Sequence, residues 1–254
     1  MKKGKKRLDI LLVERGFAAS REKAKALIMS GNVVVNDRTF DKPGTDVNED
    51  AEIVIREGLK YVSRGGLKLE GALNNFNIDV NGIVVMDVGA STGGFTDCLL
   101  QRGVKIVFAV DVGKGILDWK LRNDARVRVI EEKNIRCLEF GNIGEMTDMA
   151  VIDVSFISLK KVLPNVMKFV KDRGKIIALV KPQFEVGKGM VGKGGIVRDV
   201  SKHKGVLEDI KMFSKSIGLD IKGECESPIT GAKGNKEFWI WLEKDKIQGT
   251  TGSL

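Results

Sequence analysis

The sequence predicts an α/β protein in which a small N-terminal α+β unit precedes a Rossmann-like parallel sheet. A strand, a turn of small residues and a helix follow one another over residues 83–101, which is the first unit of a nucleotide-type sheet. Apolar runs then alternate with helix-compatible segments as far as residue 242, as expected for parallel strands joined by helices. Residues 1–25 differ in character, because they hold nine basic and three acidic residues.

The N-terminal unit shows short helices and short strands. Apolar residues at helical spacing predict a helix over residues 8–13, and Ser20 is placed to cap a second helix over residues 22–28. Valine-rich and isoleucine-rich runs predict strands at 33–35 and 51–55. The basic residues therefore concentrate on and around a helical pair.

The glycine-rich turn after the first strand of the sheet has acids on both sides. Asp87 precedes the turn, and Asp111 ends the next apolar run, 22 residues after Gly89. A dinucleotide fingerprint needs a second glycine where this chain has Ser91, and no Gly-Lys-Ser/Thr follows. An acid that can bind ribose hydroxyls without a pyrophosphate site fits S-adenosylmethionine. The predicted cofactor-binding residues are Asp87, Gly89, Ala90, Ser91, Gly93, Gly94, Phe95, Asp111 and Asn134, the last in a loop placed to meet an adenine.

The later part of the chain continues the sheet. Strands are predicted at 127–130, 149–153, 175–180 and 237–242, and helices at 67–75 and 199–217, with a flexible loop at 185–195 and fraying from Lys244 onward. Asp153 and Lys181 each follow a strand directly. Because ligands bind beyond the carboxyl ends of such strands, both are candidates for function.

Composition excludes several classes. The 254-residue chain has no run of 18 apolar residues and no apolar core behind its basic N-terminus, so neither a transmembrane helix nor a secretory signal is predicted. Its three cysteines are widely spaced, as in reduced cytoplasmic proteins. His203 is the single histidine, which argues against a metal site built on a histidine pair. The net charge of +9 favours a polyanionic partner.

The N-terminal pattern resembles the S4 RNA-binding domain. The resemblance covers roughly residues 5–56 and includes Arg7-Leu-Asp9, Arg15-Gly16, Ser20-Arg21 and Val33-x-Val35-Asn36. It implies docking onto structured RNA, mostly through phosphate contacts. The RNA-binding residues expected on this basis are Lys5, Lys6, Arg7, Arg15, Arg21 and Lys25.

Three later motifs recur in order in one family: Asp153-Val-Ser-Phe-Ile-Ser, Lys181-Pro-Gln-Phe-Glu185 and Asn235-Lys-Glu237-Phe-Trp. The chain resembles TlyA-type rRNA 2′-O-ribose methyltransferases, also known as hemolysin A, which join an S4 domain to an FtsJ-like domain. The resemblance implies a cytidine in ribosomal RNA as target and a catalytic tetrad of Lys68, Asp153, Lys181 and Glu237. Thr92 stands where the FtsJ pattern has proline, a mild departure. The expected domains are 1–58 and 65–246, with a linker at 59–64 and a tail at 247–254.

The chemistry expected of the tetrad centres on Lys181. Methyl transfer from a sulfonium to a ribose hydroxyl is an in-line displacement that needs alignment and removal of a proton. A lysine can accept that proton only when neutral, so burial or a neighbouring cation must lower its pKa from about 10.4. We expect Lys68 to be that neighbouring cation, Asp153 and Glu237 to orient the reacting groups, and Lys181 to hold or accept the proton.

Three alternatives remain at this point. The chain could be an RNA-binding protein with an inactive methyltransferase fold, although the complete tetrad argues against it. A membrane-active hemolysin would need a strongly amphipathic or spanning segment, and none is visible. A base methyltransferase would carry an Asn-Pro-Pro-Tyr-like segment or a catalytic cysteine motif, and the sequence has Asp153-Val-Ser-Phe instead.

Overall fold

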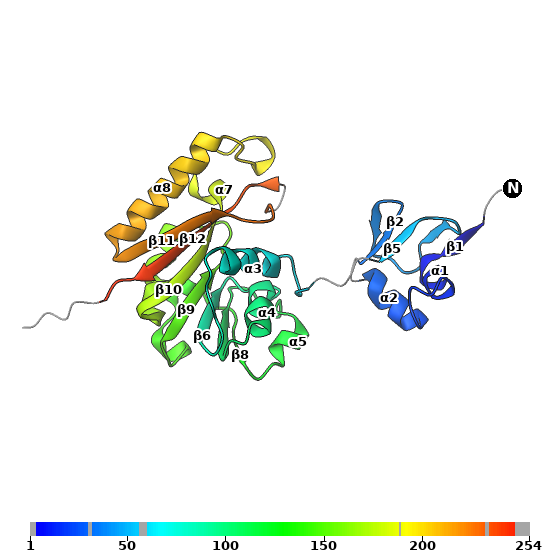
Figure 1. The fold of residues 1–254 in the computed structure, drawn as a ribbon, viewed down its shortest axis with the longest axis horizontal. Helices are drawn as coiled ribbons and strands as arrows, with labels where there is room; N and C mark the ends of the chain where they lie inside the picture. The colour runs from blue at the N-terminus through cyan, green and yellow to red at the C-terminus, as the bar shows by residue number, and fades with distance from the viewer. Residues whose placement is uncertain (1–3, 30–31, 56–59, 188, 232–233, 247–254) are drawn as a thin grey trace, which may run out of the picture. The chain divides into compact units, whose positions relative to one another are not determined.

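The computed structural model describes residues 4–29, 32–55, 60–187, 189–231 and 234–246. The chain divides into two compact units, Met1–Lys60 and Tyr61–Leu254, and each is described by itself (Figure 1). The first residue of the predicted linker, residue 59, and the predicted tail at 247–254 lie outside the described residues. Within the second unit Tyr61 is buried, and the Val62 amide donates to Asp97 Oδ2 at 2.8 Å.

The N-terminal unit packs two helices against short antiparallel strands. Its elements are β1 (Lys5–Arg7), α1 (Leu8–Glu14), α2 (Arg21–Met29), β2 (Val33–Val35), β3 (Arg38–Phe40), β4 (Asp46–Asn48) and β5 (Ile53–Ile55). Strand β1 pairs with β4, and β2 lies between β3 and β5. Leu8, Leu12 and Ile28 are completely buried with Val33 in one core, so both predicted helices bury their apolar faces. The α+β character of this unit is confirmed.

The second unit contains a seven-stranded sheet in the order β11-β12-β10-β9-β6-β7-β8. The strands are β6 (Val84–Val88), β7 (Ile106–Val110), β8 (Val127–Ile130), β9 (Thr147–Ile152), β10 (Val170–Val180), β11 (Leu219–Glu226) and β12 (Phe238–Lys244). Strands β6 to β10 run parallel to one another, and β12 pairs antiparallel with β10 on one side and with β11 on the other. The strand order reverses between β6 and β9, and ligands of such sheets bind at this switch point.

Helices cover both faces of this sheet (Figure 1). They are α3 (Gly65–Asn75), α4 (Gly94–Gln101), α5 (Trp119–Arg122), α6 (Leu163–Val166), α7 (Pro182–Glu185) and α8 (Val200–Ser216). Side chains of β6 alternate between two cores: Val84 and Met86 pack with α6 and α8, whereas Val85 packs with α3 and α4. The Rossmann-like fold predicted from the sequence is confirmed.

Several boundaries differ from the sequence prediction. Helix α3 begins at Gly65 rather than at residue 67, and β10 begins at Val170 rather than at residue 175. The expected fraying from Lys244 is wrong for this residue, because it ends β12 and its Nζ donates to the carbonyl oxygens of Met167 and Val170. Strands β1, β3, β4 and β11 and helices α5, α6 and α7 were not predicted.

Candidate functional site

The turn between β6 and α4 lies against the end of β9. Gly89 has a φ of +84°, and a Cβ atom there would be 2.4 Å from the carbonyl oxygen of Asp153. Glycine is therefore required by both backbone conformation and space. The Ser91 amide donates to Asp111 Oδ2 at 2.8 Å, so the acid after β7 holds the glycine turn from the other side. The turn is thus fixed between two neighbouring strand ends.

A cavity of about 500 Å³ opens beside this turn. It is lined by the predicted cofactor residues Gly89, Ser91, Asp111 and Asn134 and by apolar side chains, including Val112, Ile135, Val154, Ile157 and Val162. Its volume is typical of small-molecule sites. Each carboxylate oxygen of Asp111 accepts one backbone hydrogen bond, from Ser91 and from Gly113. Because a carboxylate has about four acceptor positions, it can also accept from a ligand.

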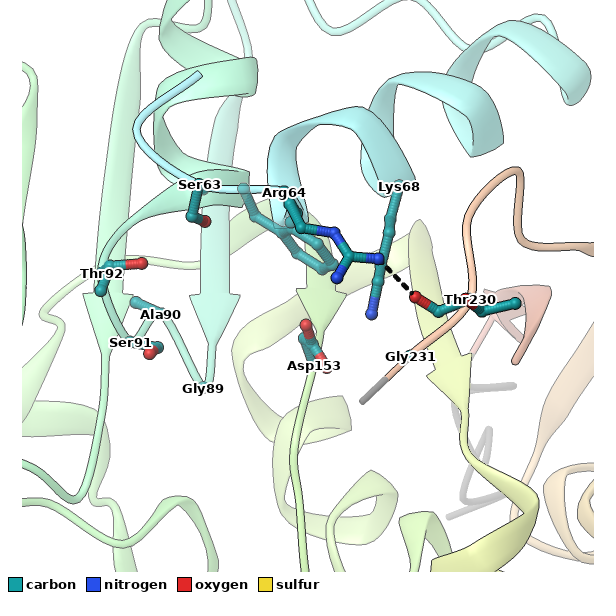
Figure 2. Close-up of a pocket in the computed structure, with 13 residues that line it drawn as sticks. Ser63, Arg64, Lys68, Gly89, Ala90, Ser91, Thr92, Asp153, Thr230 and Gly231 are labelled. Atoms are coloured by element: carbon teal, nitrogen blue, oxygen red, sulfur yellow. Dashed lines mark hydrogen bonds between the residues drawn. The ribbon is translucent and has the colours of Figure 1, made fainter. Parts of the chain in front are cut away.

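A smaller cavity of about 180 Å³ lies on the other side of the turn (Figure 2). Arg64 directly precedes α3, Lys68 lies in the first turn of α3, and the loop before β12 supplies Thr230 and Gly231. In Figure 2 the Lys68 side chain extends from α3 toward the end of β9. Gly89, Ser91 and Asp153 line both cavities. Asp153 therefore lies where the two cavities meet.

The four predicted catalytic residues form two ion pairs. Lys68 Nζ is 2.6 Å from Glu237 Oε2, and these side chains are 12% and 3% exposed. Lys181 Nζ is 2.6 Å from Asp153 Oδ1, without the alignment of a hydrogen bond, and donates to Ser155 Oγ at 2.8 Å. Each lysine is thus compensated by an acid. The role expected for Lys68, a cation next to Lys181, stays a prediction.

Other residues at the site were missed from the sequence. Phe156 is 91% exposed, lines the larger cavity and contacts Phe184 with ring centroids 4.9 Å apart. Arg64 Nη2 donates to the Thr230 carbonyl at 2.9 Å across the smaller cavity (Figure 2). Ser155 and Phe156 belong to the segment Asp153-Val-Ser-Phe. Their closeness in sequence to the candidate acid Asp153 is the one signal from which they could have been predicted as site residues.

Known proteins share both units of this chain. The sequence pattern of the FtsJ-like methyltransferase family matches residues 61–244, and that of the S4 domain matches residues 6–53. TlyA of Mycobacterium tuberculosis, named a 16S/23S rRNA (cytidine-2′-O)-methyltransferase, is 44% identical over 238 residues, covering 93% of this chain and 89% of its own. This chain belongs to the TlyA family of FtsJ-like methyltransferases.

Two further relatives are similar to this chain over nearly its whole length. YqxC of Bacillus subtilis, provisionally named an rRNA methyltransferase, is 50% identical over 240 residues, covering 94% of this chain and 85% of its own. A solved structure from Streptococcus thermophilus, provisionally named a hemolysin, has a TM-score of 0.75 and 48% identity, with coverages of 95% and 89%. The similarity of this TlyA-family chain thus extends over both units.

Two features are absent from the described segments. No helix in the described part of the chain is both long and apolar enough to span a membrane. Across the same segments, the His, Cys, Asp and Glu side chains do not gather in any group of three or more that could hold a metal ion.

The predicted RNA-binding residues of the S4 unit have unequal surroundings. Lys5 and Lys25 are exposed, and Lys6 Nζ is 2.7 Å from Glu14. Arg15 donates to the carbonyl oxygens of Glu49 and Ala51, so it joins the end of α1 to the turn before β5. Two others, Arg7 and Arg21, share the carboxylate of Asp9.

Asp87 lies beneath the turn and lines neither cavity. Its side chain is completely buried; Oδ2 accepts from Thr96 Oγ1 at 2.7 Å, and Oδ1 has no partner among the described residues. Burial raises the pKa of Asp87 to about 7, against the hydrogen bond from Thr96, and the charges of Asp153 and Asp111 add to the rise. Asp87 therefore joins β6 to α4 behind the glycine turn of this TlyA-family site.

Replacing Asp87 by asparagine is expected to change how stability depends on pH. The folded pKa of about 7 exceeds the unfolded value of about 3.9, so the native state binds the extra proton between these values. The free energy of unfolding of the native protein should therefore fall as pH rises from about 4 to about 7. Asp87→Asn keeps an acceptor for Thr96 and removes the charge. At about pH 8 the free energy of unfolding of this variant should exceed that of the unmodified protein by up to a few kcal/mol, whereas at about pH 5 it should show no such gain.

Urea denaturation at the two pH values measures this difference. Asp220→Asn is the matched control, because Asp220 lies on the exposed edge strand β11 with 61% of its side chain accessible. An equal effect of Asp87→Asn at both pH values would contradict the assignment of a buried, titrating carboxyl.

Proposed function

We propose that this chain transfers a methyl group from S-adenosylmethionine to the ribose 2′-hydroxyl of a cytidine in ribosomal RNA, within ribosomal subunits in the cytoplasm. The observation that carries the proposal is the position of Asp153. It lines both cavities and is ion-paired with Lys181. A cofactor in the larger cavity and a ribose in the smaller one would therefore meet at this ion pair. The named activity of the TlyA relative supports the same reaction.

The residues of the larger cavity fit S-adenosylmethionine. Asp111 keeps acceptor capacity for ribose hydroxyls, and Asn134 with the apolar walls suits an adenine ring. Two carboxylates, Asp111 and Asp153, line this cavity together with two cations, Lys133 and Arg136, so the fit rests on the ribose and adenine contacts rather than on the charge of the lining. A solved structure from Listeria monocytogenes, provisionally named an S-adenosylmethionine-dependent methyltransferase, shares the fold at 16% identity and a TM-score of 0.54.

Loss of the Asp111 carboxylate is expected to weaken cofactor binding. Asp111→Ala removes hydrogen bonds to a charged acceptor, each contributing about 1.5–3 kcal/mol, so affinity should fall roughly ten- to a hundred-fold. Titration calorimetry with S-adenosylmethionine measures the change. Glu132→Ala is the matched control, because Glu132 is an exposed acid whose partner is Lys114 and it lies outside the cavity lining. Equal affinity of Asp111→Ala and the unmodified protein would remove Asp111 from the site.

The two ion pairs have different roles in the proposed reaction. When bound, S-adenosylmethionine supplies a methyl group activated by its sulfonium. Asp153 and Lys181 orient the ribose hydroxyl at the meeting point of the cavities. Lys181 first releases its own proton to solvent, and the neutral amine then takes the hydroxyl proton as the methyl is transferred. Glu237 holds the Lys68 ammonium at 2.6 Å, so that Lys68 keeps a fixed position in the smaller cavity.

The surroundings of the smaller cavity suit an RNA strand. Arg64 and Lys68 place two cations at its lining, where backbone phosphates of the substrate can bind. The exposed ring of Phe156, at the lining of the larger cavity, provides a surface on which an unstacked base can pack. The S4 unit supplies a second, basic contact with structured RNA.

Methyl transfer by the purified protein tests the proposed function. Ribosomal subunits prepared from cells without this protein are incubated with radiolabelled S-adenosylmethionine, and label in the extracted rRNA is counted. We expect time-dependent labelling that Asp153→Asn lowers strongly and that the exposed-site variant Glu132→Ala leaves unchanged. Unlabelled rRNA with the active-site residues intact would exclude the proposal.

A further inference from the structure

A buried carboxylate joins two exposed arginines in the S4 unit. Arg7 donates from Nε to Asp9 Oδ1 and from Nη2 to Asp9 Oδ2, each at 3.0 Å. Arg21 Nη2 also donates to Asp9 Oδ2, at 2.9 Å. Asp9 is 0% exposed, whereas the side chains of Arg7 and Arg21 are 46% and 50% exposed. One acid inside the unit thus holds two guanidinium groups at its surface.

The backbone fixes the position of this acid. Asp9 lies in the first turn of α1, and its amide donates to the Pro43 carbonyl at 3.1 Å. Arg7 ends β1 immediately before α1, while Arg21 is the first residue of α2. A Cβ atom at Gly44 would lie 3.3 Å from Arg7 Nη1, so the loop also limits the Arg7 side chain. Three separate elements therefore converge on one carboxylate.

The charges explain why the arrangement is stable. The hydrogen bond from Arg7, with that from Arg21, holds the pKa of Asp9 well below its usual range. A buried carboxylate is tolerated only when it is paired in this way. Two adjacent guanidinium groups repel each other in turn unless an anion lies between them. Asp9 therefore compensates both arginines and keeps them close together.

We propose that Arg7 and Arg21 act together as one phosphate-binding site for RNA and that Asp9 is the residue that positions them. The inference deepens the proposed function and rests on its assignment of RNA as the substrate. Each guanidinium has five N–H donors, and Asp9 occupies two of Arg7 and one of Arg21. The remaining donors belong to two half-exposed planar groups, which suit bidentate binding of phosphate. Asp9 itself does not touch the RNA.

A purely electrostatic role of Asp9 predicts the opposite effect of its removal. Because Asp9 is negative, its loss raises the net positive charge of the S4 unit and should strengthen RNA binding if charge alone matters. If Asp9 positions the two arginines, its loss lets them separate and weakens binding. The sign of the change in affinity therefore distinguishes the two roles.

The test measures binding of deproteinised ribosomal RNA by the full chain over a series of salt concentrations. Asp9→Asn is expected to bind roughly tenfold more weakly, and the slope of log affinity against log salt should decrease by about 0.7–0.9 for one lost phosphate contact. Glu14→Gln is the matched control, since Glu14 is an exposed acid on the same helix, ion-paired with Lys6. It removes the same charge and should bind equally or slightly more tightly. Asp9→Asn that binds as tightly as Glu14→Gln, or more tightly, would overturn the proposal.

A second set of variants separates positioning from folding. In the Arg7→Ala/Arg21→Ala background, Asp9→Asn should cause no further loss of affinity, whereas a general effect on the fold would add to the loss. Arg7→Lys/Arg21→Lys leaves Asp9 paired with two cations but lacks the planar fork, so it should also bind roughly tenfold more weakly. Full affinity of this lysine variant would refute the phosphate site even if Asp9→Asn fails to fold. Methyl transfer by the unmodified protein, measured alongside, tests the proposed function separately.

Discussion

Replacing Lys181 by alanine is expected to lower the single-turnover rate of methyl transfer by roughly 10²–10⁴-fold, the range for a positioned acid–base group. Lys181 follows β10 directly, is 10% exposed, and contacts Asp153 and Ser155. Its Nζ is therefore held beside Asp153, the residue that lines both cavities. Affinities for cofactor and RNA should change little, because the larger cavity is lined by other residues.

Lys181→Arg distinguishes proton transfer from simple binding. A guanidinium stays charged and cannot accept a proton, so this variant should be as inactive as Lys181→Ala if Lys181 is the base. Lys171→Ala is the matched control, because Lys171 lies at the opposite end of the same strand, half exposed and paired with Asp148. Rates are measured with saturating cofactor and RNA. An active Lys181→Arg protein would show that Lys181 binds the hydroxyl or a phosphate and that another group takes the proton.

Deleting residues 1–58 is expected to abolish rRNA methylation at low substrate concentration while cofactor binding persists. The second unit has its own buried cores on both faces of the sheet, so it should fold alone. Joining two RNA-binding modules in one chain can raise the apparent affinity by about 10²–10⁴-fold. Losing the S4 unit should therefore reduce methylation by a similar factor. Calorimetry of cofactor binding and methyl incorporation into ribosomal subunits measure the two effects.

The salt dependence of RNA binding gives a control for this deletion. Each phosphate contact contributes about 0.7–0.9 to the slope of log affinity against log salt, so the full chain should show a steeper slope than the truncated one. Methylation of ribosomal subunits at the full rate by the truncated protein would show that the S4 unit does not dock the substrate.

The parallel sheet was predictable because its strands are buried on both faces. Residues 84–88 and 106–110 are apolar runs whose carboxyl ends carry the acids and the glycine turn, and this signal is local in the sequence. Strand β11, Leu219–Glu226, was missed because charged residues alternate along it at the edge of the sheet. Strands β1, β3 and β4 have three residues each, too few for a periodic pattern.

The residues of the site were predictable in identity but not in pairing. The motif resemblance gave Lys68, Asp153, Lys181 and Glu237, yet 169 residues separate the partners Lys68 and Glu237, and no sequence pattern specifies such a contact. The role of Asp9 was likewise invisible, because its burial depends on three elements meeting around it. Asp87 looked like a cofactor residue in the sequence, while the pleat of β6 turns its side chain toward Thr96 of α4.

The position of the transferred methyl group tests the central claim most directly. Ribosomal subunits are methylated by the purified protein with isotopically labelled S-adenosylmethionine, the rRNA is digested to nucleosides, and the labelled nucleoside is fragmented in a mass spectrometer. We predict that the label is in 2′-O-methylcytidine and leaves with the ribose fragment, and that Lys181→Ala gives almost none. Label that stays with the base fragment would contradict ribose methylation by this site.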